Sequence, residues 1–365
     1  MIYNKIEHIL ADQHQHHTQQ ALTPKDYTSD QEVRWCPGCG DYSILKQVQT
    51  VLPELGYRRE EVVFVSGIGC SSRFPYYMNT YGMHTIHGRA TAVATGLKMA
   101  RPDLAVWIVT GDGDSLSIGI GHTLHMLRRN PNVNVLLFNN QIYGLTKGQY
   151  SPTSEIGKIT KSTPAGSLEN PFNPLALALG ADATFVARSL DRDVKHLQEM
   201  IRRADAHKGT SLLEIYQNCN VFNDGAFEIL TNKNTKSDTV LVLQHQKPLR
   251  FGVNENKGIR LNGLQPEIID LNTNDFSADD LWIHNENDHA KASLLARFFD
   301  TPNLNTDGVL DPQKPTLPRP IGVLYQNNHA IPYEQAISQQ IETAKTQKIA
   351  NLNALIKGRE TWTVA

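Results

Sequence analysis

Two groups of side chains in this chain have the types and spacing that cofactor chemistry needs. The first group is rich in oxygen: Asp112 follows one apolar run, and Asn139 and Asn140 close the next one. The second group is the full set of four cysteines, Cys36, Cys39, Cys70 and Cys219. Carboxylate and amide oxygens suit a hard cation such as Mg²⁺, whereas thiolates suit zinc or iron–sulfur chemistry.

Asp112 and Asn140 are expected to meet at one edge of a parallel sheet. The runs before them, "LAVWIVT" and "VNVLLF", predict two strands joined by a helix, and ligands of open α/β sheets bind at the carboxyl ends of such strands. We therefore predict a Mg²⁺ site formed by Asp112, Asn140 and the backbone carbonyl of Ile142, with a diphosphate as a further ligand. The flexible backbone at Gly113 and the N-terminus of a helix starting near Ser115 would favour that anion.

The cysteines admit three interpretations. "WCPGC" resembles a thioredoxin-type redox pair, but the segment before it is polar, and Cys70 and Cys219 would then have no role. Four thiolates can hold structural zinc, although zinc sites usually use local pairs and these two cysteines are solitary. Four thiolates can also hold a [4Fe–4S] cluster. Cys70 lies in a glycine-rich loop at the predicted diphosphate edge, which favours a group that can accept electrons.

The elements that must position these residues alternate between strands and helices. Short apolar strands and amphipathic helices follow one another from residue 43 to residue 218, which predicts an α/β fold with a doubly wound parallel sheet. We expect three regions: an N-terminal arm (1–31), a cofactor-binding α/β domain (32–231) and a C-terminal extension (232–365). The extension is rich in asparagine, proline and charge; it either wraps a partner or forms a partly ordered appendage.

Bulk properties exclude several classes of function. The 365 residues carry a formal net charge of −2, so no overall basic field attracts nucleic acid. The apolar runs are too short to cross a membrane, and the N-terminal residues lack the pattern of a secretory signal. We expect a cytoplasmic protein, in which structural disulfides are rare.

These motifs resemble those of the β subunits of the 2-oxoacid:ferredoxin oxidoreductases, most of all the 2-oxoglutarate type. The resemblance covers roughly residues 33–229 and rests on "WCPGCG", "GIGCSSR", "HTIHGRA", "GDGDSLSIG", "NNQIYGLTKGQYSPT" and the isolated Cys219. It implies the thiamine diphosphate-binding type of fold. It also implies CoA-dependent oxidative decarboxylation of a 2-oxoacid, with electrons passing through one [4Fe–4S] cluster to ferredoxin.

The resemblance also implies roles for individual residues. It places Mg²⁺ on Asp112, Asn140 and Ile142, and the cluster on all four cysteines. The residues implied to contact thiamine diphosphate are Ile68, Gly69, Cys70, Ser71, His87, Gly88, Arg89, Ala90, Gly113, Asp114, Gly144, Leu145 and Thr146. Lys147, with Leu145, is implied in substrate choice, because its ammonium can pair with the distal carboxylate of 2-oxoglutarate. The alternatives for Lys147 are a contact with coenzyme A or a solvated charge.

The family's activating glutamate has no counterpart here, because the chain holds material for only one α/β domain of this type. We expect that residue on an α subunit, or on a fused γα subunit, and expect no catalytic residue in this chain beyond the cofactor. Alternative functions are the same reaction on pyruvate or on a broad range of 2-oxoacids, and a non-oxidative thiamine diphosphate decarboxylase half-subunit. A zinc-stabilised binding module is the non-enzymatic alternative.

Overall fold

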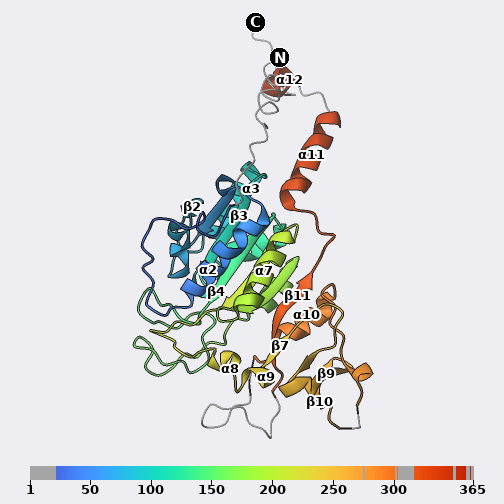
Figure 1. Cartoon of the computed structure of the whole chain (residues 1–365). Coiled ribbons are helices and arrows are strands. Elements are labelled where there is room, and N and C mark those ends of the chain that lie inside the picture. Colours follow the sequence, from blue (N-terminus) through green and yellow to red (C-terminus); the bar gives the residue numbers. More distant parts are fainter. Residues whose placement is uncertain are drawn as a thin grey trace.

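The structure is a computed structural model that describes residues 22–273, 276–300, 302, 316–347, 351–358 and 362. Its main sheet contains eight strands: β1 (Val62–Ser66), β2 (Tyr81–His84), β3 (Ala105–Gly111), β4 (Val133–Asn139), β5 (Phe185–Leu190), β6 (Ser211–Tyr216), β7 (Val240–Val242) and β11 (Arg319–Gln326). They lie in the order β2-β1-β3-β4-β6-β5-β11-β7 (Figure 1). Strands β1 to β6 are parallel, and β11 runs antiparallel to β5.

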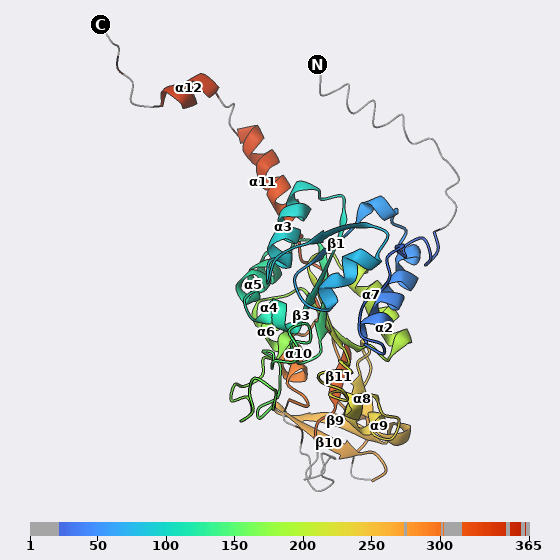
Figure 2. The same ribbon diagram turned by 90° about the vertical axis from the view of Figure 1, so that its left-hand side faces the viewer.

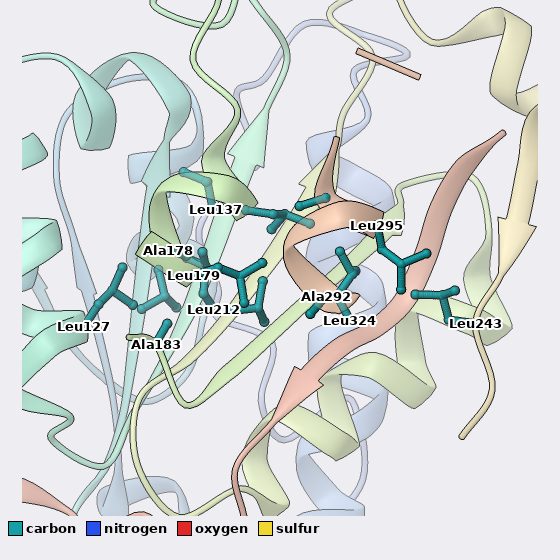
Figure 3. Packing of buried hydrophobic residues seen from close by; sticks show 14 of the residues in the cluster. Leu127, Leu137, Ala178, Leu179, Ala183, Leu212, Leu243, Ala292, Leu295 and Leu324 are labelled. Carbon is teal, nitrogen blue, oxygen red and sulfur yellow. The ribbon is translucent and has the colours of Figure 1, made fainter. Parts of the chain in front are cut away.

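Helices cover both faces of this sheet, so the predicted doubly wound α/β fold is confirmed. One face carries α2 (Asp41–Val51) and α7 (Val194–Ala206), and the other carries α3 (Ala90–Ala100), α5 (Ile120–Arg129), α6 (Pro174–Gly180) and α10 (His289–Ala296). Figure 3 shows how α6 and α10 pack on the second face: Ala178 and Leu295 lie against Leu137, Leu212 and Leu324 of the strands. These buried residues fix the strands whose ends carry the candidate site.

The helix predicted from about Ser115 is two helices in the structure. The short α4 (Asp112–Leu116) begins three residues earlier than predicted, and α5 follows after a break at Ser117. The break lies where two backbones touch: a Cβ atom on Gly88 would lie 2.4 Å from the Cα atom of Gly119. A continuous helix with side chains would not allow this approach.

The residues after 231 contribute to the main sheet as well as to smaller elements. The smaller elements are α9 (Lys236–Thr239), a second sheet of β8 (Arg250–Phe251), β9 (Lys257–Asn262) and β10 (Gln265–Asp270), and the helices α11 (Tyr333–Gln347) and α12 (Leu352–Lys357), whereas α8 (Glu228–Thr231) ends at the predicted boundary. Both β7 and β11 come from this part of the chain, so the boundary predicted after residue 231 runs through the main sheet. Helices α11 and α12 point away from the body of the molecule (Figure 2).

The N-terminal arm is described only in its last part. Residues 1–21 lie outside the described residues, and residues 22–31 pack on the body, where Tyr27 is fully buried and its hydroxyl donates to the carbonyl of Tyr57 at 2.6 Å. Short 3₁₀ helices join several elements: η1 (Leu52–Leu55), η2 (Arg59–Glu61), η3 (Ser71–Tyr77), η4 (Val253–Glu255) and η5 (Ala278–Asp280). Across the described ranges, the helices are either too short or too polar to cross a bilayer.

Candidate functional site

The strand ends bring Asp112 to the residues that close the neighbouring strand. The register of β3 and β4 pairs Gly111 with Phe138, so Asp112 and Asn139 follow side by side. Thr153 connects them, because its Oγ1 lies 2.6 Å from Asp112 Oδ2 and 3.0 Å from Asn139 Oδ1. Asp112 therefore lies beside Asn139, the residue that precedes the predicted ligand Asn140.

The carboxylate of Asp112 is held in one orientation. It is only 2% exposed, and its Oδ2 also accepts a hydrogen bond of 2.5 Å from Ser151 Oγ. Burial raises the pKa of the Asp112 carboxyl above its usual value, while the hydroxyls of Ser151 and Thr153 lower it. A buried carboxylate that accepts two hydroxyl hydrogen bonds is preorganised to bind a cation, because its rotation is already restricted.

The asparagine turn supplies the other oxygen atoms. Asn140 Oδ1 accepts a hydrogen bond of 3.2 Å from the N–H of Ile142, and the N–H of Gly144 donates to the carbonyl of Ile142 at 3.1 Å. Gln141 between them has a φ of +56°, which turns the chain sharply just after β4. The side chain of Asn223 donates to the carbonyl of Asn140 at 2.9 Å and ties this turn to the segment after β6.

Asp114 has a role that the sequence analysis did not assign to it. Its Oδ1 accepts hydrogen bonds from the N–H groups of Ile68 (3.1 Å) and Gly88 (2.8 Å), and its Oδ2 accepts one of 2.9 Å from Thr110 Oγ1. The carboxylate thus ties the loop after β1 to the turn before α3. Gly67 is needed beside it, because a Cβ atom there would lie 1.8 Å from Asp114 Oδ2.

The remaining predicted cofactor and substrate residues lie on the loops at this edge. Gly69 (φ +128°) precedes Cys70 and the buried Ser71, while Arg89 and Ala90 lie at the start of α3. Gly113 packs so closely on Tyr143 that a Cβ atom would lie 2.1 Å from that ring. Four predicted residues are exposed in this chain: His87, Leu145, Thr146 and Lys147.

The four cysteines come from three segments that meet beside the asparagine turn. All four are free thiols. A Cβ atom on Gly144 would lie 3.6 Å from the sulfur of Cys70 and 3.6 Å from that of Cys219. Cys36 and Cys39 form one tight turn, in which the N–H of Cys39 donates to the carbonyl of Cys36 at 3.0 Å.

Cys39 and Cys70 pack against the hydrophobic core and Cys219 is buried, whereas Cys36 is exposed. Burial raises the pKa of the Cys70 thiol to about 12 and also raises that of Cys39, and each thiol lies near enough to Cys219 to be affected by its charge. The indole of Trp35 donates to the carbonyl of Cys70 at 2.7 Å, which fixes that loop. Within the described ranges, no three His, Cys, Asp or Glu side chains converge closely enough to hold a single metal ion.

Several residues that build this site were missed by the sequence analysis. A buried ion pair joins Arg188 of β5 to Glu214 of β6 at 2.6 Å, and Asn139 Nδ2 donates to the same glutamate at 2.7 Å. One signal was available, since two opposite charges stand inside strands that are otherwise apolar. Ser151 and Thr153 gave no such signal, because hydroxyl residues in a loop are common.

Comparisons with known proteins agree with this geometry. Residues 67–215 match the family model described as "Thiamine pyrophosphate enzyme, C-terminal TPP binding domain". The 2-oxoglutarate oxidoreductase subunit KorB of Mycobacterium tuberculosis is 51% identical over 352 residues, which are 95% of this chain and 90% of that protein. The 2-oxoacid:ferredoxin oxidoreductase subunit beta of Saccharolobus solfataricus is 47% identical over 192 residues, which are 52% of this chain and 63% of that protein.

A solved structure matches the whole fold. It is the 2-oxoglutarate:ferredoxin oxidoreductase of Magnetococcus marinus with 2-oxoglutarate, coenzyme A and succinyl-CoA bound. The match has a TM-score of 0.70 and 34% sequence identity, and it covers 94% of this chain and 98% of that one. The similarity therefore extends beyond the cofactor-binding domain into the C-terminal part of the chain.

Proposed function

Because the chain belongs to the β subunits of the 2-oxoacid:ferredoxin oxidoreductases, we propose that it forms the thiamine diphosphate-binding half of an enzyme that oxidatively decarboxylates 2-oxoglutarate. Coenzyme A accepts the acyl group in this proposal, and ferredoxin accepts the electrons. The main support for this proposal is that two donor sets lie at one edge of the sheet. The first is the oxygen atoms of Asp112, Asn140 and Ile142, and the second is the sulfur atoms of the four cysteines. The turn that contains Asn140 and Ile142 continues directly into Gly144, where an added Cβ atom would lie 3.6 Å from the sulfurs of both Cys70 and Cys219.

The oxygen donors fit a magnesium diphosphate. Asp112, Asn140 and the carbonyl of Ile142 are hard ligands, and Mg²⁺ usually completes its shell with phosphate oxygens and water. Thiamine diphosphate, when bound, supplies the stabilised carbon nucleophile that is needed to break the carbon–carbon bond next to a keto group. The chain's own residues then have a positioning role: Ser151 and Thr153 orient Asp112, and Asp114 holds the two loops that border the cofactor.

The thiols fit a [4Fe–4S] cluster better than zinc. Tetrahedral zinc requires four donors around one ion, whereas a cubane cluster has a separate iron for each thiolate. The sulfurs of Cys70 and Cys219 lie beside Gly144, close to the proposed thiamine diphosphate site, where a cluster can accept electrons and zinc cannot. The apolar packing around Cys39 and Cys70 would also shield a cluster from water.

The test is to co-express the chain with its α subunit and purify the complex without oxygen. We expect iron and sulfide near four of each per chain, bound thiamine diphosphate, and ferredoxin reduction that needs both 2-oxoglutarate and coenzyme A. Zinc in place of iron would refute the cluster. A complex that decarboxylates without reducing ferredoxin would indicate a non-oxidative decarboxylase instead.

Lys147 is proposed to contact the distal carboxylate of 2-oxoglutarate. It is exposed, has a φ of +76°, and lies five residues after Ile142 on the turn closed by Tyr143 and Gln149. The α subunit and the substrate would bury it, and a charged hydrogen bond in such a place contributes about 1.5–3 kcal/mol. Lys147→Thr should therefore raise KM for 2-oxoglutarate by about 10- to 100-fold, with little effect on pyruvate.

Steady-state kinetics with the two substrates provide the measurement. The control is Lys161→Thr, at an exposed position of the same long segment between β4 and α6. It should leave both KM values unchanged. Equal losses for both substrates in Lys147→Thr would show that this lysine does not select the substrate.

A further inference from the structure

Gln217 lies between the two donor sets of the candidate site. It directly follows β6, is 1% exposed, and its N–H donates to the carbonyl of Asn139 at 3.0 Å. Its side-chain Oε1 accepts a hydrogen bond of 2.9 Å from Asn140 Nδ2. Its Nε2 lies 3.3 Å from the sulfur of Cys39 and 2.6 Å from the carbonyl of Asn218. One side chain thus connects a proposed metal ligand to a proposed cluster ligand.

The partners fix the orientation of both amides. Asn140 Oδ1 already accepts from the N–H of Ile142, so the nitrogen of Asn140 is the atom that faces Gln217. Gln217 Nε2 faces an oxygen and a sulfur, and both of these accept hydrogen bonds. Its two hydrogens and its Oε1 each have a partner, as a buried amide requires.

We infer that Gln217 is a positioning residue with two effects, one on the metal ligand Asn140 and one on the cluster ligand Cys39. Its Oε1 holds the Asn140 amide so that Oδ1 stays directed toward the N–H of Ile142. Its Nε2–H donates to the Cys39 sulfur. This inference rests on the proposed Mg²⁺ and [4Fe–4S] sites.

The hydrogen bond from Gln217 to Cys39 should change the reduction potential of the cluster in a defined direction. A cluster gains negative charge when it is reduced, and hydrogen bonds to the ligand sulfurs are one of the factors that set its potential. An N–H dipole that points at the Cys39 sulfur stabilises this added charge, so it makes the reduction potential less negative. Partners that orient metal ligands typically change metal affinity by about 10- to 100-fold when they are removed.

Two substitutions separate these effects. Gln217→Met has a similar length but neither donates to Cys39 nor accepts well from Asn140. Gln217→Glu keeps an oxygen opposite Asn140 Nδ2 but loses the N–H that faces the sulfur. Gln198→Met is the matched control, because Gln198 donates to Gln47 at 2.7 Å on the helices α2 and α7 and contacts neither donor set.

The variants are measured as the complete complex with the α subunit, at matched iron and sulfide content. Redox titration followed by electron paramagnetic resonance should give a more negative midpoint potential for both Gln217 variants. The expected size is on the order of a tenfold change in the one-electron reduction equilibrium, or about 59 mV. Calorimetric titration of cofactor-depleted complex should show weaker binding of Mg²⁺ with thiamine diphosphate, on the order of tenfold or more for Gln217→Met and less for Gln217→Glu.

Two kinds of failure can be told apart. If the parent complex contains iron, sulfide and thiamine diphosphate but both variants keep its potential and its cofactor affinity, the inference about Gln217 is wrong and the proposed function stands. If the parent complex lacks the cluster or the cofactor, the proposed function itself fails. If Gln217→Met is too unstable to study, Gln217→Leu replaces it, because leucine also lacks both hydrogen-bonding groups and adds no charge near the Cys39 sulfur.

Discussion

Hydroxyl groups orient the carboxylate of Asp112, which we propose as a metal ligand. Asp112 Oδ2 accepts from both Ser151 and Thr153, and Thr153 also contacts Asn139, which donates to Glu214. The network therefore runs from the sheet edge into the buried ion pair of β5 and β6. Its function is to keep Asp112 in place when the cofactor is absent.

Thr153→Val should weaken the binding of Mg²⁺ and thiamine diphosphate by about 10- to 100-fold, because it removes one of the two hydroxyls that orient Asp112. The shape of the side chain is nearly unchanged, so packing is kept. Calorimetric titration of the cofactor-depleted complex measures the affinity. Thr343→Val, on the exposed face of α11, is the control; an affinity equal to the parent's in Thr153→Val would exclude this role.

The candidate metal and cluster ligands could be recognised from the sequence. The hydroxyl and amide side chains that orient these ligands could not. Asp112, Asn140, Cys70 and Cys219 stand at the ends of apolar runs, where parallel strands converge, and Cys36 and Cys39 form a close pair. Ser151, Thr153 and Gln217 act through contacts with segments distant in the chain. No local pattern distinguishes a loop hydroxyl that reaches a carboxylate from one that faces solvent.

At the opposite end of the sheet, His207 makes folding sensitive to acid. It is 3% exposed, and its Nε2 lies 2.7 Å from Thr184 Oγ1, which donates to Asn130 and so accepts from the histidine. Burial lowers the pKa of His207 to about 4, against about 6.5 in an unfolded chain. The folded state keeps this histidine neutral, so stability is full above pH 6.5 and falls as the pH drops from 6.5 to 4.

His207→Gln should therefore lessen the loss of stability in mild acid. The pKa difference lowers the free energy of unfolding by about 3 kcal/mol at pH 4 and below. Roughly half of this decrease occurs between pH 7 and pH 5. Urea unfolding at these two pH values measures the difference. His125→Gln, at an exposed position of α5, should keep the parent's pH dependence; the same dependence in His207→Gln would rule out this histidine as the cause.

At the scale of elements, the strands β1, β3, β4, β5 and β6 were predictable, whereas β2, the strands after residue 231 and the break between α4 and α5 were not. Each of the strands β1, β3, β4, β5 and β6 is a short apolar run, and the sheet buries every residue of four of them. The break depends on Gly88, which belongs to a different segment and has a φ of +65°. The helical pattern of residues 112–129 therefore could not predict the break, because the break is caused by contact with a segment distant in the sequence.

Gly88→Ala and Gly96→Ala should have opposite effects on stability. Gly88 has a left-handed backbone and touches Gly119, so a methyl group there should cost at least about 1–3 kcal/mol and disturb the loop held by Asp114. Gly96 lies inside α3 with open space around it, so alanine should stabilise by about 0.5–1 kcal/mol. Chemical denaturation measures both; destabilisation by Gly96→Ala would contradict the packing described for α3.

At the scale of the whole molecule, the C-terminal part completes the main sheet. β11 covers the edge of β5, and β7 pairs with β11. Arg203 of α7 forms an ion pair with Glu286 at 2.7 Å, which joins the same two parts of the chain. Most of this was not predictable, because β11 pairs with residues more than a hundred positions earlier.

Truncation after residue 231 should therefore give insoluble protein, since it exposes the apolar edge strand β5. Truncation after Pro332 removes only α11 and α12 and should leave the sheet folded, with a melting temperature within a few degrees of the parent. Solubility and thermal unfolding of the two proteins, each co-expressed with the α subunit, give the comparison. A soluble, folded protein that ends at residue 231 would show that β11 is dispensable.

The position of β11 also sets an order of events at the ribosome. The strands that carry Asp112 and Asn140, and all four cysteines, are synthesised before residue 220, whereas β11 begins at Arg319. At about 5–20 residues per second, the chain between β5 and β11 takes roughly 6–26 s to emerge. During this interval β5 has no neighbour on one side, although the ligands for both cofactors have already been made. The nascent chain therefore exposes an unpaired edge strand after all residues of the candidate site have been made.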